Sequence, residues 1–245
     1  MCAVWASLKG HLVKLYYALL NLLHRPLVRR GELDPFHQVF REFHTLVQNI
    51  QSPVVLEIGA RNVTGETSRR HLFPSAGRYV GFDLYSGEGV NVVGDAHQLT
   101  KYFPPNSIDA ILSVSVFEHL AFPWKVVLEM NQVLKVGGLV FVATHPAWPS
   151  HELPSDFWRY PVAGLSTLFI RETGFEIVGA TEGLPCKAYS LVTDPPTRDF
   201  FKFYLNMGVA VIAKKISDYD SVRLRWDVNV NQLLSSSYPV SHQKD

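Results

Sequence analysis

Cysteine is scarce in this sequence, whose 245 residues include only Cys2 and Cys186. Two cysteines cannot form a framework of several disulfides, and these two lack the close spacing of zinc ligands. Disulfide-rich secreted scaffolds and cysteine-based metal proteins are therefore excluded. Because a chain of this kind suits a reducing compartment, we expect the protein to be cytoplasmic.

The sequence also lacks a long apolar run. A membrane-spanning helix needs about 20 consecutive apolar residues. The most apolar segment, residues 4–23, is interrupted by Lys9, His11, Lys14 and Asn21. The charged start and the small-residue cleavage site of a signal peptide are missing as well. We therefore expect neither a transmembrane helix nor a signal peptide.

Neither sign of charge is in excess, because the formal net charge is +1 and hydrophobic residues make up 47% of the chain. This composition is typical of a folded globular protein. No basic stripe is interleaved with aromatic residues, which argues against DNA or RNA as a partner. The length is sufficient for one large domain or two small ones, either with a sizeable core.

The first 30 residues have the pattern of a basic amphipathic helix. Apolar residues recur at helical spacing, at Val4, Leu8, Leu12, Leu15, Leu19 and Leu22. The basic residues are Lys9, Lys14, Arg25, Arg29 and Arg30. We favour a lid that packs on the domain, and the alternative is contact with an anionic surface at the inner face of a membrane. We predict a helical lid segment over 1–50, the main domain over 51–215 and a partly flexible tail over 216–245.

Strand-like and helix-like segments alternate along the main domain. Apolar runs predict strands over 54–58, 78–83, 90–93, 108–113, 139–144, 175–180 and 208–213. Helical patterns lie over 34–50, 64–72, 123–134 and 161–173, and residues 95–102 are expected to form a turn or a helix. A glycine-rich loop over 84–89 replaces one crossover helix. This alternation predicts an α/β fold, a Rossmann-like doubly wound and mostly parallel sheet of about seven strands.

The end of the first strand carries the strongest functional signal. Glu57 closes an apolar run and the glycine turn at Gly59 follows at once. Asp83 ends the next strand 24 residues after Gly59, a distance at which a carboxylate can bind a ribose diol. A dinucleotide fingerprint needs glycine where this chain has Arg61. The pattern therefore favours an adenosine ligand without phosphate, and S-adenosylmethionine is the common one.

With these residues in place, the chain resembles the class I S-adenosylmethionine-dependent methyltransferases, in particular the methyltransferase-11-type domain. The resemblance covers about residues 53–182. Its motifs are LEIGAR at 56–61, GFDL at 81–84, GDAH at 94–97, IDA at 108–110, FEHL at 117–120 and VLKVGG at 133–138. Two departures are a glycine-rich turn reduced to Gly59 and Val136 in place of the usual proline.

The resemblance implies S-adenosylmethionine as the cofactor and a set of residues around it. The set comprises Glu57, Gly59, Ala60, Arg61, Asp83, Leu84, Asp95, Ala96, His97, Ser113 and Val114. Gly59, Ala60 and Arg61 would meet the methionine moiety, Asp83 the ribose, Asp95 and Ala96 the adenine edge, and Ser113 and Val114 the cofactor at the end of the fourth strand. Other roles stay open: a turn cap for Asp83, a helix cap for Asp95, a solvated position for Arg61, and for Glu57 hydrogen bonds from backbone N–H groups of the turn.

Histidine is the natural general base near neutral pH. The candidates are His145, His119 and His151, although a structural hydrogen bond with Glu118 or the backbone is the favoured role of His119. A proline-containing loop separates His145 from His151, so we predict no metal site there.

The expected function is transfer of a methyl group to an O or N atom of a small-molecule acceptor, such as a secondary metabolite or a saccharide. Trp148, Phe157, Trp158 and Tyr160 either stack on a planar acceptor or, as we favour, pack over the sheet edge. The insertion 183–205 is expected to help shape the acceptor pocket. The alternative is a non-catalytic S-adenosylmethionine-binding protein with a regulatory or scaffold role at a membrane surface. Arg61 disfavours an NAD-dependent oxidoreductase.

Overall fold

The computed structural model describes residues 2–27, 30–63, 65, 69–192 and 194–225. The chain divides into two compact units, residues 1–34 and residues 35–245. The first unit contains helix α1 (Cys2–His24) and the 3₁₀ helices η1 (Arg25–Leu27) and η2 (Gly31–Leu33). Within the described residues, no helix combines the length and the apolar character needed to span a membrane.

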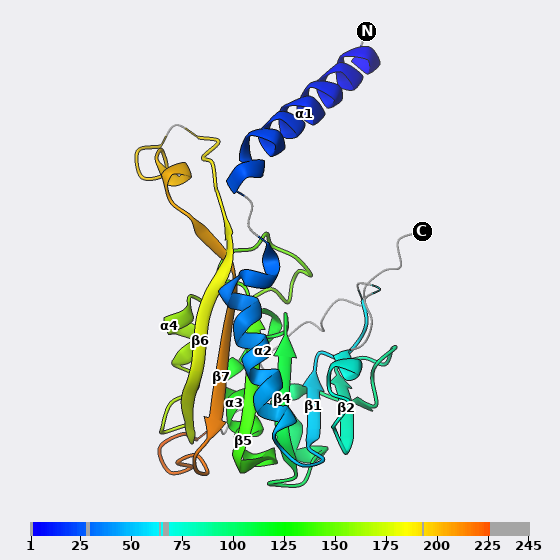
Figure 1. Ribbon diagram of the computed structural model, residues 1–245, viewed down its shortest axis with the longest axis vertical. Helices are drawn as coiled ribbons and strands as arrows, with labels where there is room; N and C mark the ends of the chain where they lie inside the picture. The colour runs from blue at the N-terminus through cyan, green and yellow to red at the C-terminus, as the bar shows by residue number, and fades with distance from the viewer. Residues whose placement is uncertain (1, 28–29, 64, 66–68, 193, 226–245) are drawn as a thin grey trace. The chain divides into compact units, whose positions relative to one another are not determined.

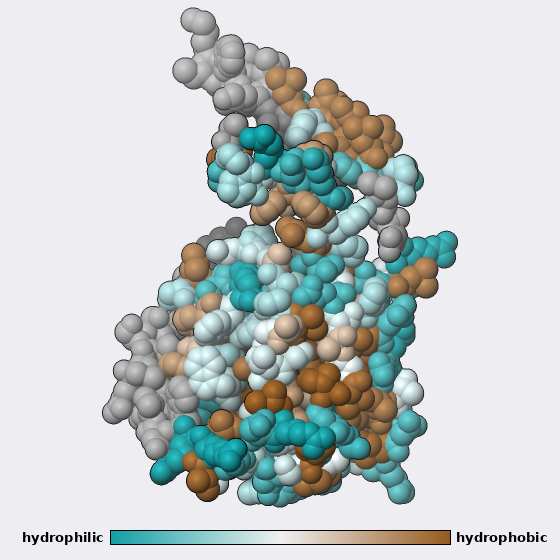
Figure 2. Space-filling model, turned by 90° about the vertical axis from the view of Figure 1, so that its left-hand side faces the viewer, coloured by the Kyte–Doolittle hydropathy of each residue, from teal (hydrophilic) through white to brown (hydrophobic). Residues whose placement is uncertain are grey.

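Helix α1 exposes much of its apolar side. The side chains of this helix that are more than half exposed include Leu12, Leu15, Tyr16, Tyr17, Leu19, Leu22 and Leu23. Figure 2 shows exposed apolar surface of this kind in brown. The roles considered for this helix, a lid or a membrane contact, remain predictions.

The second unit is built on one open sheet of seven strands, in the order β3-β2-β1-β4-β5-β7-β6 (Figure 1). The strands are β1 (Val54–Ile58), β2 (Arg78–Asp83), β3 (Val92–Val93), β4 (Ile108–Val114), β5 (Leu134–Thr144), β6 (Phe175–Cys186) and β7 (Leu205–Lys215). The pairs among β1 to β5 are parallel, whereas β7 runs antiparallel to both β5 and β6. The predicted Rossmann-like, mostly parallel sheet is confirmed.

Helices cover both faces of the sheet, so the central strands β1 and β4 are almost entirely buried, whereas the edge strands β3 and β6 are not. Figure 1 shows α2 (Pro35–Gln48) in front of the sheet, and α3 (Pro123–Val133) and α4 (Val162–Ser166) behind it. On the front face, the ring of Phe43 from α2 stacks on Phe141 from β5 at 5.3 Å between centroids. The structure therefore groups α2 with the sheet and places the division of the chain after residue 34, not after residue 50.

Several helices are shorter than their sequence patterns predict. The helix expected over 64–72 is the 3₁₀ helix η3 (Arg69–Leu72), with residues 64 and 66–68 outside the described part. The segment after Asp95 is also 3₁₀, η4 (Ala96–Lys101). The helix predicted over 161–173 is only the five residues of α4, because the chain then turns: the Thr173 hydroxyl accepts a hydrogen bond from Ile170 N–H and donates one to the Leu168 carbonyl oxygen.

The strands near the C-terminal end are longer than predicted. Strands β6 and β7 pair with each other from Phe175↔Lys215 to Cys186↔Leu205, which leaves 187–204 as the connection between them. Strand β5 begins at Leu134, before the predicted start at residue 139, and runs through Gly137 at φ +84°. Cross-strand pairing, which a single segment does not reveal, accounts for these extensions. The described part of the tail, residues 216–225, is irregular apart from a turn at 221–223, and the rest of the predicted tail lies outside the described residues.

Candidate functional site

The turn after β1 is built around Gly59. Its N–H and that of Ala60 both donate to the carbonyl oxygen of Phe82, at 2.8 and 3.1 Å. Gly59 has φ +82°, and a Cβ placed on it would lie 2.2 Å from Val116 Cγ2. A positive φ and so close a neighbour leave room only for glycine, so this position keeps the backbone turning sharply at the carboxyl end of β1.

Glu57 is buried at the end of β1, where two side chains hold its carboxylate. Tyr79 donates its hydroxyl to Oε2 at 2.7 Å, and Arg69 donates Nη1 to Oε1 at 2.9 Å. Burial and the neighbouring Glu57 charge raise the pKa of Tyr79 far above its ordinary value. Within the described residues, side chains and not backbone N–H groups of the turn therefore fix this acid, which differs from the expected arrangement.

Asp83 ends β2 beside the Gly59 turn and accepts two backbone hydrogen bonds. Arg61 N–H donates to Oδ2 at 3.2 Å and Tyr85 N–H donates to Oδ1 at 3.0 Å. The Arg61 side chain is also close, with Nε 3.7 Å from Oδ1 and its guanidinium carbon 5.3 Å from the Tyr85 ring centre. The Arg61 side chain thus pairs with Asp83 and is only 14% exposed, so the solvated position considered for it is wrong. Leu84, which follows Asp83, is exposed.

Asp95 performs the capping role considered for it. Its Oδ1 accepts a hydrogen bond from His97 N–H at 2.9 Å and lies 2.7 Å from His97 Nδ1. Burial acts to raise the pKa of Asp95, but the hydrogen bonds and charge of His97 outweigh it, so the pKa lies below its ordinary value. The other ring nitrogen of His97 accepts Phe122 N–H at 3.4 Å. Both ring nitrogens of His97 therefore contact groups of the protein itself, Asp95 and Phe122. Ala96, the preceding residue, is buried.

Ser113 and Val114 lie at the carboxyl end of β4, in the centre of the sheet. Ser113 sits between Ile58 of β1 and Val142 of β5 and is fully buried. Its hydroxyl has no hydrogen-bond partner in the part of the chain that the structure describes. Ser113 thus belongs to the interior of the sheet, whereas Val114, the last residue of β4, is half-buried.

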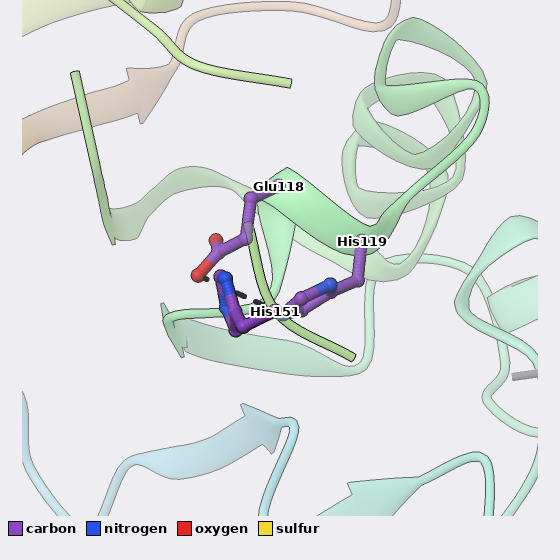
Figure 3. Close-up of side chains that lie close together, drawn as sticks. All are labelled: Glu118, His119 and His151. Carbon is purple, nitrogen blue, oxygen red and sulfur yellow. Dashed lines mark ion pairs between the residues drawn. The ribbon is translucent and has the colours of Figure 1, made fainter. Parts of the chain in front are cut away.

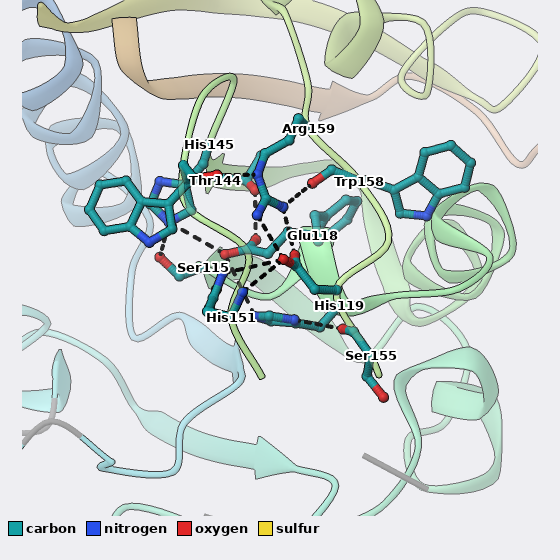
Figure 4. Close-up of polar contacts among 12 residues, drawn as sticks. Ser115, Glu118, His119, Thr144, His145, His151, Ser155, Trp158 and Arg159 are labelled. Carbon is teal, nitrogen blue, oxygen red and sulfur yellow. Dashed lines mark hydrogen bonds and ion pairs between the residues drawn. The ribbon is translucent and has the colours of Figure 1, made fainter. Parts of the chain in front are cut away.

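A second group of polar side chains surrounds Glu118, which the short 3₁₀ helix η5 (Phe117–His119) carries just after β4 (Figure 4). Glu118 is fully buried. Thr144 at the end of β5 donates its hydroxyl to Glu118 Oε2 at 2.6 Å. The next residue, His145, places Nε2 3.4 Å from Glu118 Oε1 and 3.2 Å from Ser115 Oγ.

The tautomer of His145 follows from its other contact. Its Nδ1 lies 3.0 Å from the carbonyl oxygen of Met207, which can only accept a hydrogen bond. In the neutral ring Nδ1 therefore carries the hydrogen, and the other nitrogen, Nε2, faces Glu118 and Ser115. The ring also stacks on Trp148 at 4.5 Å between centroids, which restricts its orientation.

His119 and His151 lie on the other side of Glu118. Their rings meet edge to face at 4.7 Å, and His119 Nε2 is 3.9 Å from Glu118 Oε1. The structure thus brings all three predicted histidines to one carboxylate. From its sequence position Glu118 was expected only as a partner of His119, and the adjacent Glu-His pair is the signal that marks it as the centre of the group.

A salt bridge holds the loop that carries His151. Asp156, only 4% exposed, accepts two hydrogen bonds from Arg159, at 2.6 Å to Nη1 and 2.8 Å to Nη2. The Arg159 guanidinium holds the pKa of the Asp156 carboxyl well below its usual range. The N–H groups of Phe157 and Trp158 both donate to the Glu118 carbonyl oxygen, so the loop is tied to the same residue that its histidine approaches.

The Asp83 carboxylate keeps hydrogen-bonding capacity that suits the ribose of an adenosine ligand. A carboxylate offers about four lone-pair sites, and the two backbone N–H groups on Asp83 leave one further site on each oxygen. Those are the acceptors that a ribose diol requires. The Gly59 turn also brings backbone close to the same point without a side chain.

Comparisons with known proteins cover part of this region and the fold as a whole. A family model described as a methyltransferase domain matches residues 64–142. A search of curated proteins finds no match. Among solved structures, an S-adenosylmethionine-dependent methyltransferase from Archaeoglobus fulgidus is 17% identical, with a TM-score of 0.54 over 82% of this chain and 100% of that one. A putative methyltransferase from Bacillus halodurans C-125 is 13% identical, with a TM-score of 0.56 over 73% of this chain and 99% of that one. At these identities the structures establish a shared fold.

Proposed function

We propose that this chain, a class I S-adenosylmethionine-dependent methyltransferase, transfers the methyl group to an oxygen or nitrogen atom of a small-molecule acceptor. When bound, S-adenosylmethionine supplies an electrophilic methyl group carried on a positively charged sulfur. The acceptor atom must then lose a proton as it attacks. The observation that carries the proposal is the His145–Glu118 pair beside Ser115, just past the carboxyl ends of β4 and β5.

In this proposal Asp83 binds the ribose diol, and the Gly59 turn lies along the methionine moiety. The two backbone hydrogen bonds to Asp83 preset its carboxylate, so little ordering is needed on binding. Asp95 and Ala96 are proposed to meet the adenine edge, in line with the family match that begins before them. Proximity and alignment in a site closed to water supply most of the rate in such a transfer.

His145 is the proposed general base. The Met207 carbonyl keeps hydrogen on Nδ1, so Nε2 is the atom that takes a proton from the acceptor. Glu118 Oε1 lies 3.4 Å from that atom, where it can accept a hydrogen bond from the imidazole N–H that forms when Nε2 takes the proton. Ser115 Oγ lies 3.2 Å from Nε2. This contact shows that a hydroxyl group can approach Nε2 to hydrogen-bond distance, as the hydroxyl or amine of an acceptor must.

Aromatic rings near this pair support an organic acceptor. Trp148 stacks on His145 and is 44% exposed, and Phe157 in the same loop region is 43% exposed. Such half-exposed rings pack well against the carbon skeleton of a metabolite or against the apolar face of a sugar. The secondary-metabolite and saccharide classes both meet this requirement.

The test is transfer of a labelled methyl group from S-adenosylmethionine to a panel of small hydroxyl and amine compounds. We expect His145→Ala to lower turnover by about 100-fold, the contribution of one general base, without changing cofactor affinity by calorimetry. His37→Ala, which removes an exposed histidine on α2, is the matched control. A fully active His145→Ala variant would reject the base assignment. Tight cofactor binding without transfer to any compound would instead favour the non-catalytic alternative, which no observation now supports.

The N-terminal unit has a proposed role in the same function. We favour a lid whose exposed leucines cover the bound acceptor, and removal of residues 1–34 should then raise the KM for the acceptor. Flotation of the intact and shortened chains with anionic liposomes tests the membrane alternative. Co-flotation that depends on residues 1–34 would replace the lid by a membrane contact.

A further inference from the structure

One oxygen of the Glu118 carboxylate has no hydrogen-bond partner among the described residues. The residue is fully buried, and Oε2 accepts the Thr144 hydroxyl. Oε1 accepts no hydrogen bond from any described residue. Carboxylates are rarely buried unless they are paired, fully hydrogen-bonded or bound to a metal ion. Oε1 faces His145 Nε2 at 3.4 Å and His119 Nε2 at 3.9 Å without a hydrogen bond, an arrangement that a bound cation would complete.

Two histidines direct nitrogen atoms toward the same place. Glu118, His119 and His151 each offer one ligand atom, and these atoms lie within 4.8 Å of one another (Figure 3). The three residues come from η5 and from the loop that follows β5. Figure 3 shows their side chains converging, so the group surrounds one point in space and is not spread along a surface.

Backbone carbonyl groups orient both imidazole rings for ligation. His119 Nδ1 lies 2.8 Å from the Ser155 carbonyl oxygen, and His151 Nδ1 lies 3.1 Å from the Pro149 carbonyl oxygen. Since a carbonyl oxygen only accepts, both Nδ1 atoms carry the hydrogen in the neutral ring, which leaves Nε2 as the lone-pair atom. A hydrogen bond from the non-ligating nitrogen to a carbonyl or carboxylate is the usual support of a metal-binding histidine.

The loop that brings His151 to the group is fixed to Glu118 itself. Phe157 and Trp158 donate their N–H groups to the Glu118 carbonyl oxygen, at 2.8 and 3.1 Å. Asp156 accepts the His151 N–H at 3.0 Å and is itself clamped by Arg159. Residues far apart in sequence are thereby held in one arrangement, as a preformed metal site requires.

We propose that Glu118, His119 and His151 bind a divalent transition-metal ion of the zinc or iron(II) type. Two imidazole nitrogens and one carboxylate oxygen are the ligand set of open zinc sites and of non-haem iron(II) sites. Magnesium and calcium prefer oxygen ligands only and do not fit this set. The single carboxylate charge partly balances the ion, and three protein ligands leave at least one coordination position for the acceptor or water.

The geometry requires a small contraction. Ligand atoms of a tetrahedral zinc ion lie about 3.4 Å apart, because the bonds measure roughly 2.0–2.2 Å. The three ligand atoms now lie within 4.8 Å of one another, so their largest separation must shorten by up to about 1.4 Å when the ion binds. His151 is the ligand best able to move, since its side chain is 29% exposed and sits on a loop. His145 lies outside the set, although its Nε2 faces the same Glu118 oxygen.

This inference does not depend on the methyl-transfer proposal, because metal binding is measured without turnover. The full chain is stripped with a chelator and titrated with Zn²⁺ by calorimetry, and with Co²⁺ by visible absorption. We expect one equivalent of each metal and, for Co²⁺, the intense absorption of a low-coordinate site. His151→Ala and Glu118→Gln should each weaken Zn²⁺ binding at least tenfold, while His37→Ala should bind as the unaltered chain does.

Two outcomes would overturn the site. One is the absence of stoichiometric Zn²⁺ and Co²⁺ binding in the folded chain, and the other is unchanged affinity in His151→Ala. His151 lies on a half-exposed loop, so this variant remains informative even if Glu118→Gln does not fold. Calorimetric binding of S-adenosylmethionine to the same stripped protein separates the two proposals, since loss of the metal site leaves cofactor binding at Asp83 unaffected.

Discussion

The Tyr79 hydroxyl on β2 donates a hydrogen bond of 2.7 Å to the Glu57 carboxylate on the neighbouring strand β1, and both residues are buried. This bond joins two strands next to the turn that is proposed to receive the cofactor. In Tyr79→Phe, one carboxylate oxygen loses its donor in the interior. We expect the free energy of unfolding at neutral pH to fall by about 1–3 kcal/mol, measured by urea denaturation.

The same pair predicts a pH dependence. The pKa of Tyr79 in the folded protein lies above its ordinary value of about 10, since burial and the Glu57 charge disfavour the phenolate. The stabilisation that Tyr79 provides is therefore complete below pH ~10 and declines as the pH rises beyond that value. The difference in unfolding free energy between the unaltered chain and Tyr79→Phe should shrink above pH ~10. A difference that stays constant from neutral to strongly alkaline pH would contradict this account.

Gly59→Ala should disrupt the turn that follows β1. Alanine at φ +82° is strained, and its Cβ would lie 2.2 Å from Val116 Cγ2. We expect a stability loss of roughly 1–3 kcal/mol together with weaker binding of S-adenosylmethionine. Gly137→Ala is the control, because Gly137 has φ +84° but no atom within 4 Å of an added Cβ. If both variants lose the same stability, the contact with Val116 has no energetic effect.

Asp83→Asn should weaken cofactor binding while the fold is kept. The amide preserves the shape but removes the charge and one acceptor that the ribose diol would use. The expected loss is about 1–3 kcal/mol in calorimetric titration with S-adenosylmethionine, the value for hydrogen bonds to a charged group. Asp109→Asn is a suitable control, because Asp109 accepts Val54 N–H and pairs with Lys135 at the other end of the strands. Equal affinities for Asp83→Asn and the unaltered chain would refute the ribose assignment.

Lys215, the last residue of β7, stabilises the C-terminal end of this strand through hydrogen bonds made in the protein interior. It is fully buried, and its ammonium group donates to the carbonyl oxygens of Asn131 and Leu134 at 2.7 and 2.8 Å. Lys215→Met leaves these acceptors without their donor, so we expect a loss on the order of 3 kcal/mol in chemical denaturation. Lys214→Met, at the exposed neighbouring position, should change stability by less than about 0.5 kcal/mol. Similar losses for the two variants would show that burial of Lys215 is not what matters.

The order of strands and helices followed from the sequence because of the way this sheet is buried. Helices cover both faces, so β1, β4 and β5 appear as short continuous apolar runs, and Asp83 marks the end of β2. The turn at Gly59 could also be predicted from the sequence, since only glycine suits its backbone conformation. The lengths of α4, β6 and β7 could not be predicted from the sequence. Local hydrogen bonds outweigh helical propensity after α4, and pairing between the strands extends β6 and β7.

Sequence alone determined the fold class, the cofactor class and the residues that lie near the ends of the parallel strands. Only the tertiary structure decided that Arg61 pairs with Asp83, that Tyr79 and Arg69 hold Glu57, and that α2 belongs with the sheet. It alone also gathered three histidines around the incompletely bonded oxygen of Glu118. The physical reason is that spacing along the chain reports local backbone geometry, whereas a carboxylate finds its partners through the packing of segments that are remote in sequence.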